Sequence, residues 1–140
     1  METIKECKPW LRHYDEGVPE TLESLAGCAM AVLTNKPHRF SRRMLEGLGI
    51  DRFFSAVYGG NSFSRKKPDP VGVFQILSDT GASRDAAWMV GDSSVDVLTG
   101  RNAGIRTCGV TYGYAPRSFE IHPPDRLIDA FGELRHVIEP

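Results

Sequence analysis

Hydrophobic residues follow two alternating patterns from Val18 onward. Val18, Leu22 and Leu25 recur at helical spacing, and Gly27 is a residue type that often ends a helix. The next run, residues 28–33, is continuously apolar, which is typical of a strand buried on both faces of a parallel sheet. The pattern therefore predicts a helix followed by a buried strand.

The same alternation continues toward the C-terminus. It predicts further helices over 40–48, 69–81, 93–103 and 131–138, and further strands over 53–58, 86–90, 105–110 and 127–128. Alternating strands and helices favour an α/β fold with a mainly parallel sheet and right-handed crossovers. No linker divides residues 17–140, so we expect a single domain there, preceded by a weakly patterned segment, residues 1–16.

Polar residues that could carry chemistry gather where the predicted strands end. Thr34 and Asn35 follow the first strand, Lys67 lies in the segment after the second, and Asp92 and Asp96 follow the third. In a parallel sheet the carboxyl ends of the strands share one edge, and ligands bind there. A hydroxyl, a cation and two carboxylates at one edge suit an anionic substrate. They also suit Mg²⁺, a hard cation that favours carboxylate and water oxygens.

Each of these residues also has a purely structural interpretation. Thr34 could be only a β-branched strand residue, and Lys67 could belong to a solvated basic run. Asp92 could cap the following helix, and Ser93 with Asp96 could form a capping box. The functional interpretation depends on all of them lying at the same edge of the sheet.

The composition argues against several classes of protein. The 140 residues include 17 Lys or Arg and 18 Asp or Glu, so no cationic excess favours nucleic-acid binding. No apolar run is long enough to cross a membrane, and the first residues lack the apolar stretch of a signal peptide. The three cysteines are far apart and outside metal-ligand spacing, which favours reduced thiols. We therefore expect a cytoplasmic protein with no nucleic-acid or membrane partner.

Four stretches of the chain carry a family resemblance. In order, they are AVLTNKP, GGNSFSRKKPDP, MVGDSSVDV and GIRTCGVTYGY. Their order resembles the haloacid dehalogenase superfamily of phosphohydrolases, and most of all its phosphoglycolate phosphatase branch, over roughly residues 17–115. The resemblance implies a three-layer, Rossmann-like core and Mg²⁺-dependent hydrolysis of a phosphate monoester. It also implies a small phosphorylated metabolite as the substrate.

The same resemblance assigns a role to each residue of the edge. Thr34, with the backbone amide of Asn35, would bind the phosphoryl oxygens, and Lys67 would neutralise charge on the phosphoryl group. Asp92 would coordinate Mg²⁺, and Asp96 would support the metal site or orient Lys67. These roles suit phosphoryl transfer, in which catalysis is mostly positioning and electrostatic stabilisation.

One motif of the family has no match in this chain. It is a strand ending in Asp-x-Asp-Gly-Thr, and it carries the nucleophile. In the family this strand lies between the two strands that correspond to those ending here at Thr34 and Asp92. The cap that follows it has no match either, and residues 1–16 are a candidate remnant of the cap or a linker. We therefore expect a truncated chain that is inactive alone, with residues 17–140 forming a partial core.

The missing strand has a structural consequence. It predicts either a gap at the centre of the sheet or direct pairing of the two strands beside it, because buried backbone groups need partners. It also predicts self-association through exposed strand edges, or complementation by an N-terminal segment.

Two other functions stay open at this stage. A non-catalytic protein could keep Thr34, Lys67 and Asp92 as a phosphate- or Mg²⁺-binding site, or serve as an interaction module. A dehalogenase could use the same framework, although the basic run at residues 65–67 favours a phosphate ester.

Overall fold

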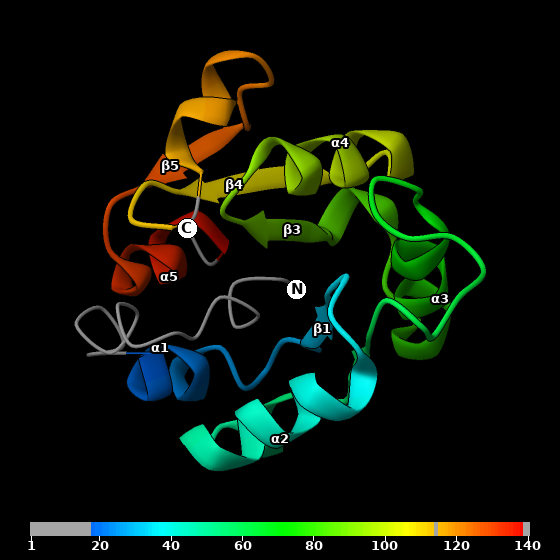
Figure 1. Ribbon diagram of the computed structural model, residues 1–140. Coiled ribbons are helices and arrows are strands. Elements are labelled where there is room, and N and C mark those ends of the chain that lie inside the picture. Colours follow the sequence, from blue (N-terminus) through cyan, green and yellow to red (C-terminus); the bar gives the residue numbers. More distant parts are fainter. Residues whose placement is uncertain (1–17, 114, 139–140) are drawn as a thin grey trace.

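The computed structural model describes residues 18–113 and 115–138, and its elements follow the predicted α/β order (Figure 1). The helices are α1 Val18–Ser24, α2 His38–Leu48, α3 Val71–Thr80, α4 Ser94–Ala103 and α5 Leu134–Ile138. The strands are β1 Ala31–Leu33, β2 Ala56–Tyr58, β3 Trp88–Gly91, β4 Arg106–Val110 and β5 Arg126–Ile128. Short 3₁₀ helices connect them at Asp51–Phe53, Arg84–Ala86, Pro116–Glu120 and Phe131–Glu133. The segment 1–16, expected to be a cap remnant or linker, lies outside the described residues.

The described strands form two separate parallel sheets. β1 pairs with β2, with Val32 opposite Val57, and β4 lies between β3 and β5. β1 and β3 are not ladder neighbours, so the predicted sheet is interrupted at its centre. The sequence left open a gap or direct pairing at this point, and within residues 18–113 and 115–138 the structure has the gap.

Successive residues of the central strands pack on opposite faces, as the two-residue repeat of a strand requires. Val32 and Val90 belong to an apolar cluster with α1 and α5, whereas Leu33 and Met89 belong to a second cluster with α3. α3 packs on β1 and against α4, which covers β3 and β4 (Figure 1). Helices therefore cover both faces of the sheets, and the three-layer α/β architecture is confirmed.

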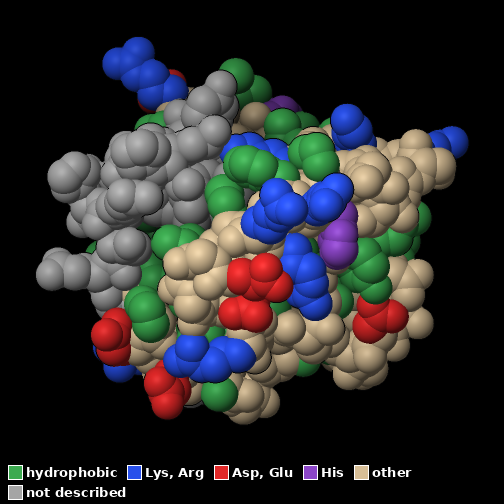
Figure 2. Space-filling model, turned by 60° about the horizontal axis from the view of Figure 1, so that its bottom comes forward, with side chains coloured by type: hydrophobic (Ala, Val, Ile, Leu, Met, Phe, Trp, Pro, Cys, Tyr) green, Lys and Arg blue, Asp and Glu red, His purple; other side chains and the backbone are tan. Residues whose placement is uncertain are grey.

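The face that carries α2 has charges of both signs. Arg39, Arg42 and Arg43 are exposed on this helix, together with Glu46. Figure 2 shows basic and acidic side chains intermixed across the face rather than gathered in a field of one sign. In the part of the chain that the structure describes, no helix is long and apolar enough to span a bilayer.

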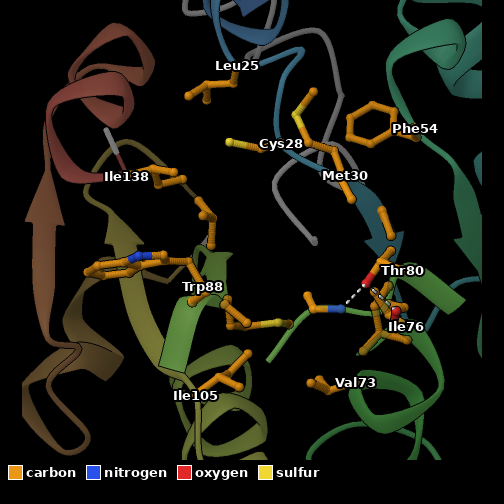
Figure 3. A pocket seen from close by; sticks show the side chains of 18 of the residues that line it. Leu25, Cys28, Met30, Phe54, Val73, Ile76, Thr80, Trp88, Ile105 and Ile138 are labelled. Carbon is orange, nitrogen blue, oxygen red and sulfur yellow. Dashed lines mark hydrogen bonds between the residues drawn. The ribbon is translucent and has the colours of Figure 1, made fainter. Parts of the chain in front are cut away.

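An apolar cavity of about 290 Å³ lies between β1 and β3 (Figure 3). Leu25 and Ile138 line it from one face of the sheets, and Val73 and Ile105 line it from the other. The interruption between β1 and β3 is therefore lined by apolar side chains.

Candidate functional site

Thr34 directly follows β1 and is held inside the protein. Its side chain is among the most buried in the described chain, and its amide donates a hydrogen bond to the carbonyl of Tyr58 at 3.0 Å. Its Oγ1 accepts a hydrogen bond from the amide of Lys36 at 3.1 Å. These two bonds fix the turn at the end of β1 and keep the hydroxyl at the edge of the sheet.

Asn35 holds the loop that carries Lys67. The amide of Lys67 donates to Oδ1 of Asn35 at 3.1 Å, and Nδ2 of Asn35 donates to the carbonyl of Lys67 at 3.3 Å. The following peptide bond, Lys67–Pro68, is cis. One side chain thus satisfies both backbone groups of Lys67, although the two residues are 32 positions apart in sequence.

Lys67 and Asp96 form a buried ion pair. Nζ of Lys67 lies 2.6 Å from Oδ1 of Asp96, and the two side chains are 1% and 2% exposed. The second oxygen of Asp96 accepts a hydrogen bond from the amide of Asp92 at 3.0 Å. A continuous series of bonds therefore runs from the end of β1, through Asn35, Lys67 and Asp96, to the end of β3. We call Thr34, Asn35, Lys67, Asp92 and Asp96 the edge cluster.

Two glycines let the chain approach the edge cluster closely. A Cβ at Gly91 would lie 2.2 Å from Oδ2 of Asp96, and a Cβ at Gly113 would lie 2.2 Å from Cβ of Asp92. Both distances are far below van der Waals contact. Asp92 is therefore packed under the loop that follows β4, and Asp96 under the end of β3.

The structure decides between several of the alternatives that the sequence left open. Lys67 is buried, so its interpretation as part of a solvated run is wrong, whereas its neighbour Lys66 is exposed. The N-cap of α4 is Ser93 rather than Asp92, and its side chain makes no capping bond. Asp96 reaches back to the amide of Asp92, one residue before the position that a capping box requires.

The edge cluster has donor chemistry that fits Mg²⁺. Mg²⁺ usually takes one or two carboxylates and completes its octahedron with water or substrate phosphate. Both oxygens of Asp96 bond within the protein, one to Nζ of Lys67 and one to the amide of Asp92, and the carboxylate of Asp92 is the second of the cluster. No group of three or more His, Cys, Asp or Glu side chains suited to a metal occurs in the described residues.

Sequence reasoning missed three features of the site. It assigned only the backbone amide of Asn35, whereas the structure shows the Asn35 side chain bonded to the backbone of Lys67. It did not single out Gly91 and Gly113, whose lack of a side chain is needed for close packing. Their signal in the sequence is position, because each glycine stands at or just beyond the end of a predicted strand.

Three ionisable groups of the described residues, all outside the edge cluster, have shifted pKa values. The hydroxyl of Tyr58 donates to Asp79, which raises the pKa of Tyr58 and lowers the pKa of Asp79. Burial, chiefly, raises the pKa of the Cys108 thiol to about 12. None of these shifts involves a residue that the sequence singled out for function.

The fold and the site together define a class of protein. A parallel sheet covered by helices on both faces, with polar residues collected at the carboxyl ends of its strands, is a Rossmann-like α/β core. The family model described as haloacid dehalogenase-like hydrolase matches residues 3–110. The chain therefore belongs to the haloacid dehalogenase-like hydrolases, and the resemblance predicted from its motifs is confirmed.

Individual relatives agree with this family. The chain is 40% identical over 131 residues to the phosphoglycolate phosphatase of Vibrio parahaemolyticus, covering 91% of this chain and 58% of the relative. It is also 40% identical over 124 residues to that of Pectobacterium atrosepticum, covering 86% and 53%. The chain thus spans about half the length of the curated relatives it matches.

Solved structures confirm the fold. The crystal structure of a predicted phosphoglycolate phosphatase from Haemophilus somnus superposes with a TM-score of 0.81 at 34% identity, covering 86% of this chain and 55% of that one. A haloacid dehalogenase-superfamily hydrolase from Geobacter sulfurreducens superposes with a TM-score of 0.75 at 25% identity, covering 87% and 59%.

Proposed function

We propose that the chain provides the phosphate- and cation-binding half of a phosphate monoester hydrolase of the phosphoglycolate phosphatase type. The observation that carries this proposal is the buried Lys67–Asp96 ion pair beside Asp92 and Thr34. A buried ion pair is expensive to desolvate and is weak support for a purely stabilising role. The relatives named phosphoglycolate phosphatase support the same reaction class.

The substrate's phosphoryl oxygens are bound by the Thr34 hydroxyl and the backbone amide of Asn35. Nζ of Lys67 adds a positive charge that Asp96 orients at 2.6 Å. Because these groups are buried, their electrostatic interaction with an incoming anion is stronger than it would be in water. Asp92 is 2% exposed and is packed against Gly113.

Asp92 would hold the divalent cation, with Asp96 as its neighbour on α4. When bound, Mg²⁺ supplies charge neutralisation at the phosphoryl oxygens. Asp96 is more important as the group that orients Lys67, because Lys67 and the amide of Asp92 occupy both of its oxygens.

The family's nucleophile is the part of the site for which this sequence has no matching motif. A carboxylate nucleophile splits a difficult displacement into two easier steps, and the family places it in a motif that has no match here. We therefore propose that residues 17–140 are a partial core, and that these 140 residues bind phosphate but do not turn over an ester by themselves.

Binding and turnover are tested separately. Titration calorimetry with inorganic phosphate, with and without Mg²⁺, measures binding, and Lys67→Met or Asp92→Asn should weaken it about tenfold or more. Lys66→Met is the matched control, because this neighbouring lysine is exposed, and it should leave binding unchanged. Phosphoglycolate hydrolysis should be absent. Robust turnover that is abolished by Asp92→Ala would contradict the proposed inactivity and require a nucleophile elsewhere in the chain.

A non-catalytic phosphate- or Mg²⁺-binding protein is the second candidate, and the same edge cluster supports it. The two candidate functions are distinguished by adding an N-terminal fragment of a relative that carries the Asp-x-Asp-Gly-Thr motif. Restored hydrolysis favours the hydrolase. Phosphate binding that is insensitive to the fragment, with no hydrolysis, favours the binding protein.

A further inference from the structure

The loops that follow β1 and β2 leave the sheet side by side, because the last residues of the two strands are opposite each other in the parallel ladder. The loop after β1, residues 34–37, carries Thr34 and Asn35, the phosphate-binding residues of the proposed function. The loop after β2, residues 59–62, has the sequence Gly-Gly-Asn-Ser, and the proposed function gives it no role. Its contacts with the first loop therefore bear on phosphate binding.

Hydrogen bonds join the two loops. The amide of Gly60 donates to the carbonyl of Lys36 at 2.7 Å. The amide of His38 donates to Oδ1 of Asn61 at 3.0 Å. His38 is the first residue of α2, and the N-cap residue of this helix, Pro37, makes no side-chain capping bond. Asn61 therefore caps α2 from a position 23 residues further along the chain.

Two glycines allow the loops to approach so closely. A Cβ at Gly59 would lie 2.2 Å from the amide nitrogen of His38, and a Cβ at Gly60 would lie 2.1 Å from the carbonyl oxygen of Asn35. Ser62 closes the turn, since its Oγ accepts a bond from the amide of Gly59 at 2.8 Å and its own amide donates to the Gly59 carbonyl at 3.1 Å. The second loop is therefore a compact turn packed against the backbone of the first.

We infer that Asn61 is a positioning residue for phosphate binding, an inference that rests on the proposed function. Thr34 and Asn35 bind the phosphoryl oxygens together only when their loop holds the hydroxyl and the amide in one arrangement. Asn61 stabilises that arrangement by fixing the start of α2, three residues after Asn35. A loop that is ordered before the ligand arrives loses less conformational entropy on binding. A purely structural cap would instead stabilise α2 and leave the affinity for phosphate unchanged.

Asn61→Ala tests this role at an exposed position. Titration calorimetry with inorganic phosphate should show binding about fivefold weaker than in the unchanged chain, the affinity equivalent of one neutral hydrogen bond. The titration is made well below the melting temperatures of both proteins. Both are then folded, so a loss of stability alone does not weaken binding.

Ser55→Ala is the matched control, because it removes one side-chain bond between the same two strands at their opposite end. Oγ of Ser55 donates to the carbonyl of Met30 at 3.1 Å, and these two residues directly precede β2 and β1. Ser55 is exposed, like Asn61. Ser55→Ala should lower the melting temperature about as much as Asn61→Ala and leave phosphate binding unchanged.

Hydrogen exchange locates the effect without any ligand. The amide of His38 should exchange faster in Asn61→Ala than in the unchanged chain or in Ser55→Ala. Asn61→Asp keeps an acceptor oxygen for this amide and should restore its slow exchange. An exchange rate at His38 that is the same in Asn61→Ala and in the unchanged chain would overturn the inference.

Phosphate binding separates this inference from the proposed function. Equal affinities of the unchanged chain and Asn61→Ala would overturn the inference and leave the proposed function standing. Equal losses of affinity in Asn61→Ala and Ser55→Ala would also overturn it, because any loosening of the two strands would then have the same effect. If the unchanged chain binds no phosphate, the proposed function is wrong, and the role of Asn61 in binding is wrong with it.

Discussion

β1 and β3 border two contrasting regions, the edge cluster at their carboxyl ends and the apolar cavity between them. In the edge cluster, buried polar groups bond to one another across the interruption of the sheet, from Asn35 through Lys67 to Asp96. In the cavity, the same two strands present apolar side chains and strand edges that no described strand covers. The comparison teaches that long side chains can connect the halves of a sheet that the backbone ladder does not connect.

The largest expected effect comes from breaking the ion pair. Lys67→Met leaves the buried Asp96 without its cation, and removing one partner of a buried pair typically costs about 3–5 kcal/mol. Urea unfolding of the variant should show this loss. The double variant Lys67→Met/Asp96→Asn should lose clearly less than the sum of the two single variants, because it leaves no unpaired buried charge.

The control for this experiment lies one residue away. Lys66 is exposed, so Lys66→Met should change the stability by less than about 0.5 kcal/mol. Equal losses for Lys66→Met and Lys67→Met would show that the ion pair does not hold the two halves of the sheet together, and the contrast between the two regions would fail.

A second variant tests how tightly the edge cluster is packed. Gly91→Ala places a Cβ about 2.2 Å from Oδ2 of Asp96, so the carboxylate must move. Overpacking of this kind costs about 1–3 kcal/mol. Gly47→Ala is the matched control, because a Cβ there meets nothing within 4 Å and the site is in the exposed part of α2. It should stabilise the protein by about 0.5–1 kcal/mol. The same sign for both in thermal unfolding would contradict the packing argument.

A smaller effect is expected where the edge cluster uses neutral hydrogen bonds. Asn35→Ala removes both bonds to the backbone of Lys67, at about 1 kcal/mol each. Asn102→Ala is the control, because its exposed side chain donates one bond, of 2.9 Å, to the carbonyl of the adjacent Pro68. Urea unfolding should show the larger loss for Asn35→Ala, and phosphate binding should weaken only in that variant. Weaker phosphate binding in the Asn102 variant would contradict this prediction. It would show that Lys67 is not positioned by its two bonds to Asn35 alone.

Local pattern was enough to predict most of the fold. The continuous apolar run before Thr34 and the helical spacing of Val18, Leu22 and Leu25 correspond to β1 and α1. These elements are short-range consequences of which side chains are buried. The interruption between β1 and β3 was foreseen only through the family resemblance, because a missing strand leaves no trace in the hydrophobic pattern of the strands that remain.

The edge cluster shows where sequence reasoning ends. Its residues could be selected because strand ends converge in a parallel sheet, and the structure brings all five together. The bonds among them could not be predicted, since Asn35 and Lys67 are 32 positions apart and Lys67 and Asp96 are 29 apart. Contacts at such separations depend on the tertiary arrangement, which no local periodicity encodes.

The last comparison uses two cysteines, Cys108 in the apolar core at β4 and Cys28 at the cavity. Cys108 is buried within β4, and burial, chiefly, raises the pKa of its thiol to about 12 from an ordinary value of 9.0. Cys28 lines the cavity and is partly exposed. The thiolate is the reactive form, so at pH 8 native Cys108 should resist alkylation while Cys28 reacts. Mass spectrometry after iodoacetamide treatment identifies the modified residue.

The pH dependence of stability sharpens this prediction. A raised pKa means that the unfolded thiol loses its proton first, so the contribution of Cys108 to stability is complete below about pH 9 and is lost as the pH rises through about 12. Cys108→Ala should therefore flatten the alkaline loss of stability. Alkylation of native Cys108 as fast as that of Cys28 would mean that the β3–β4–β5 sheet exposes its core as readily as the cavity exposes its lining. The contrast between these two regions would then be wrong.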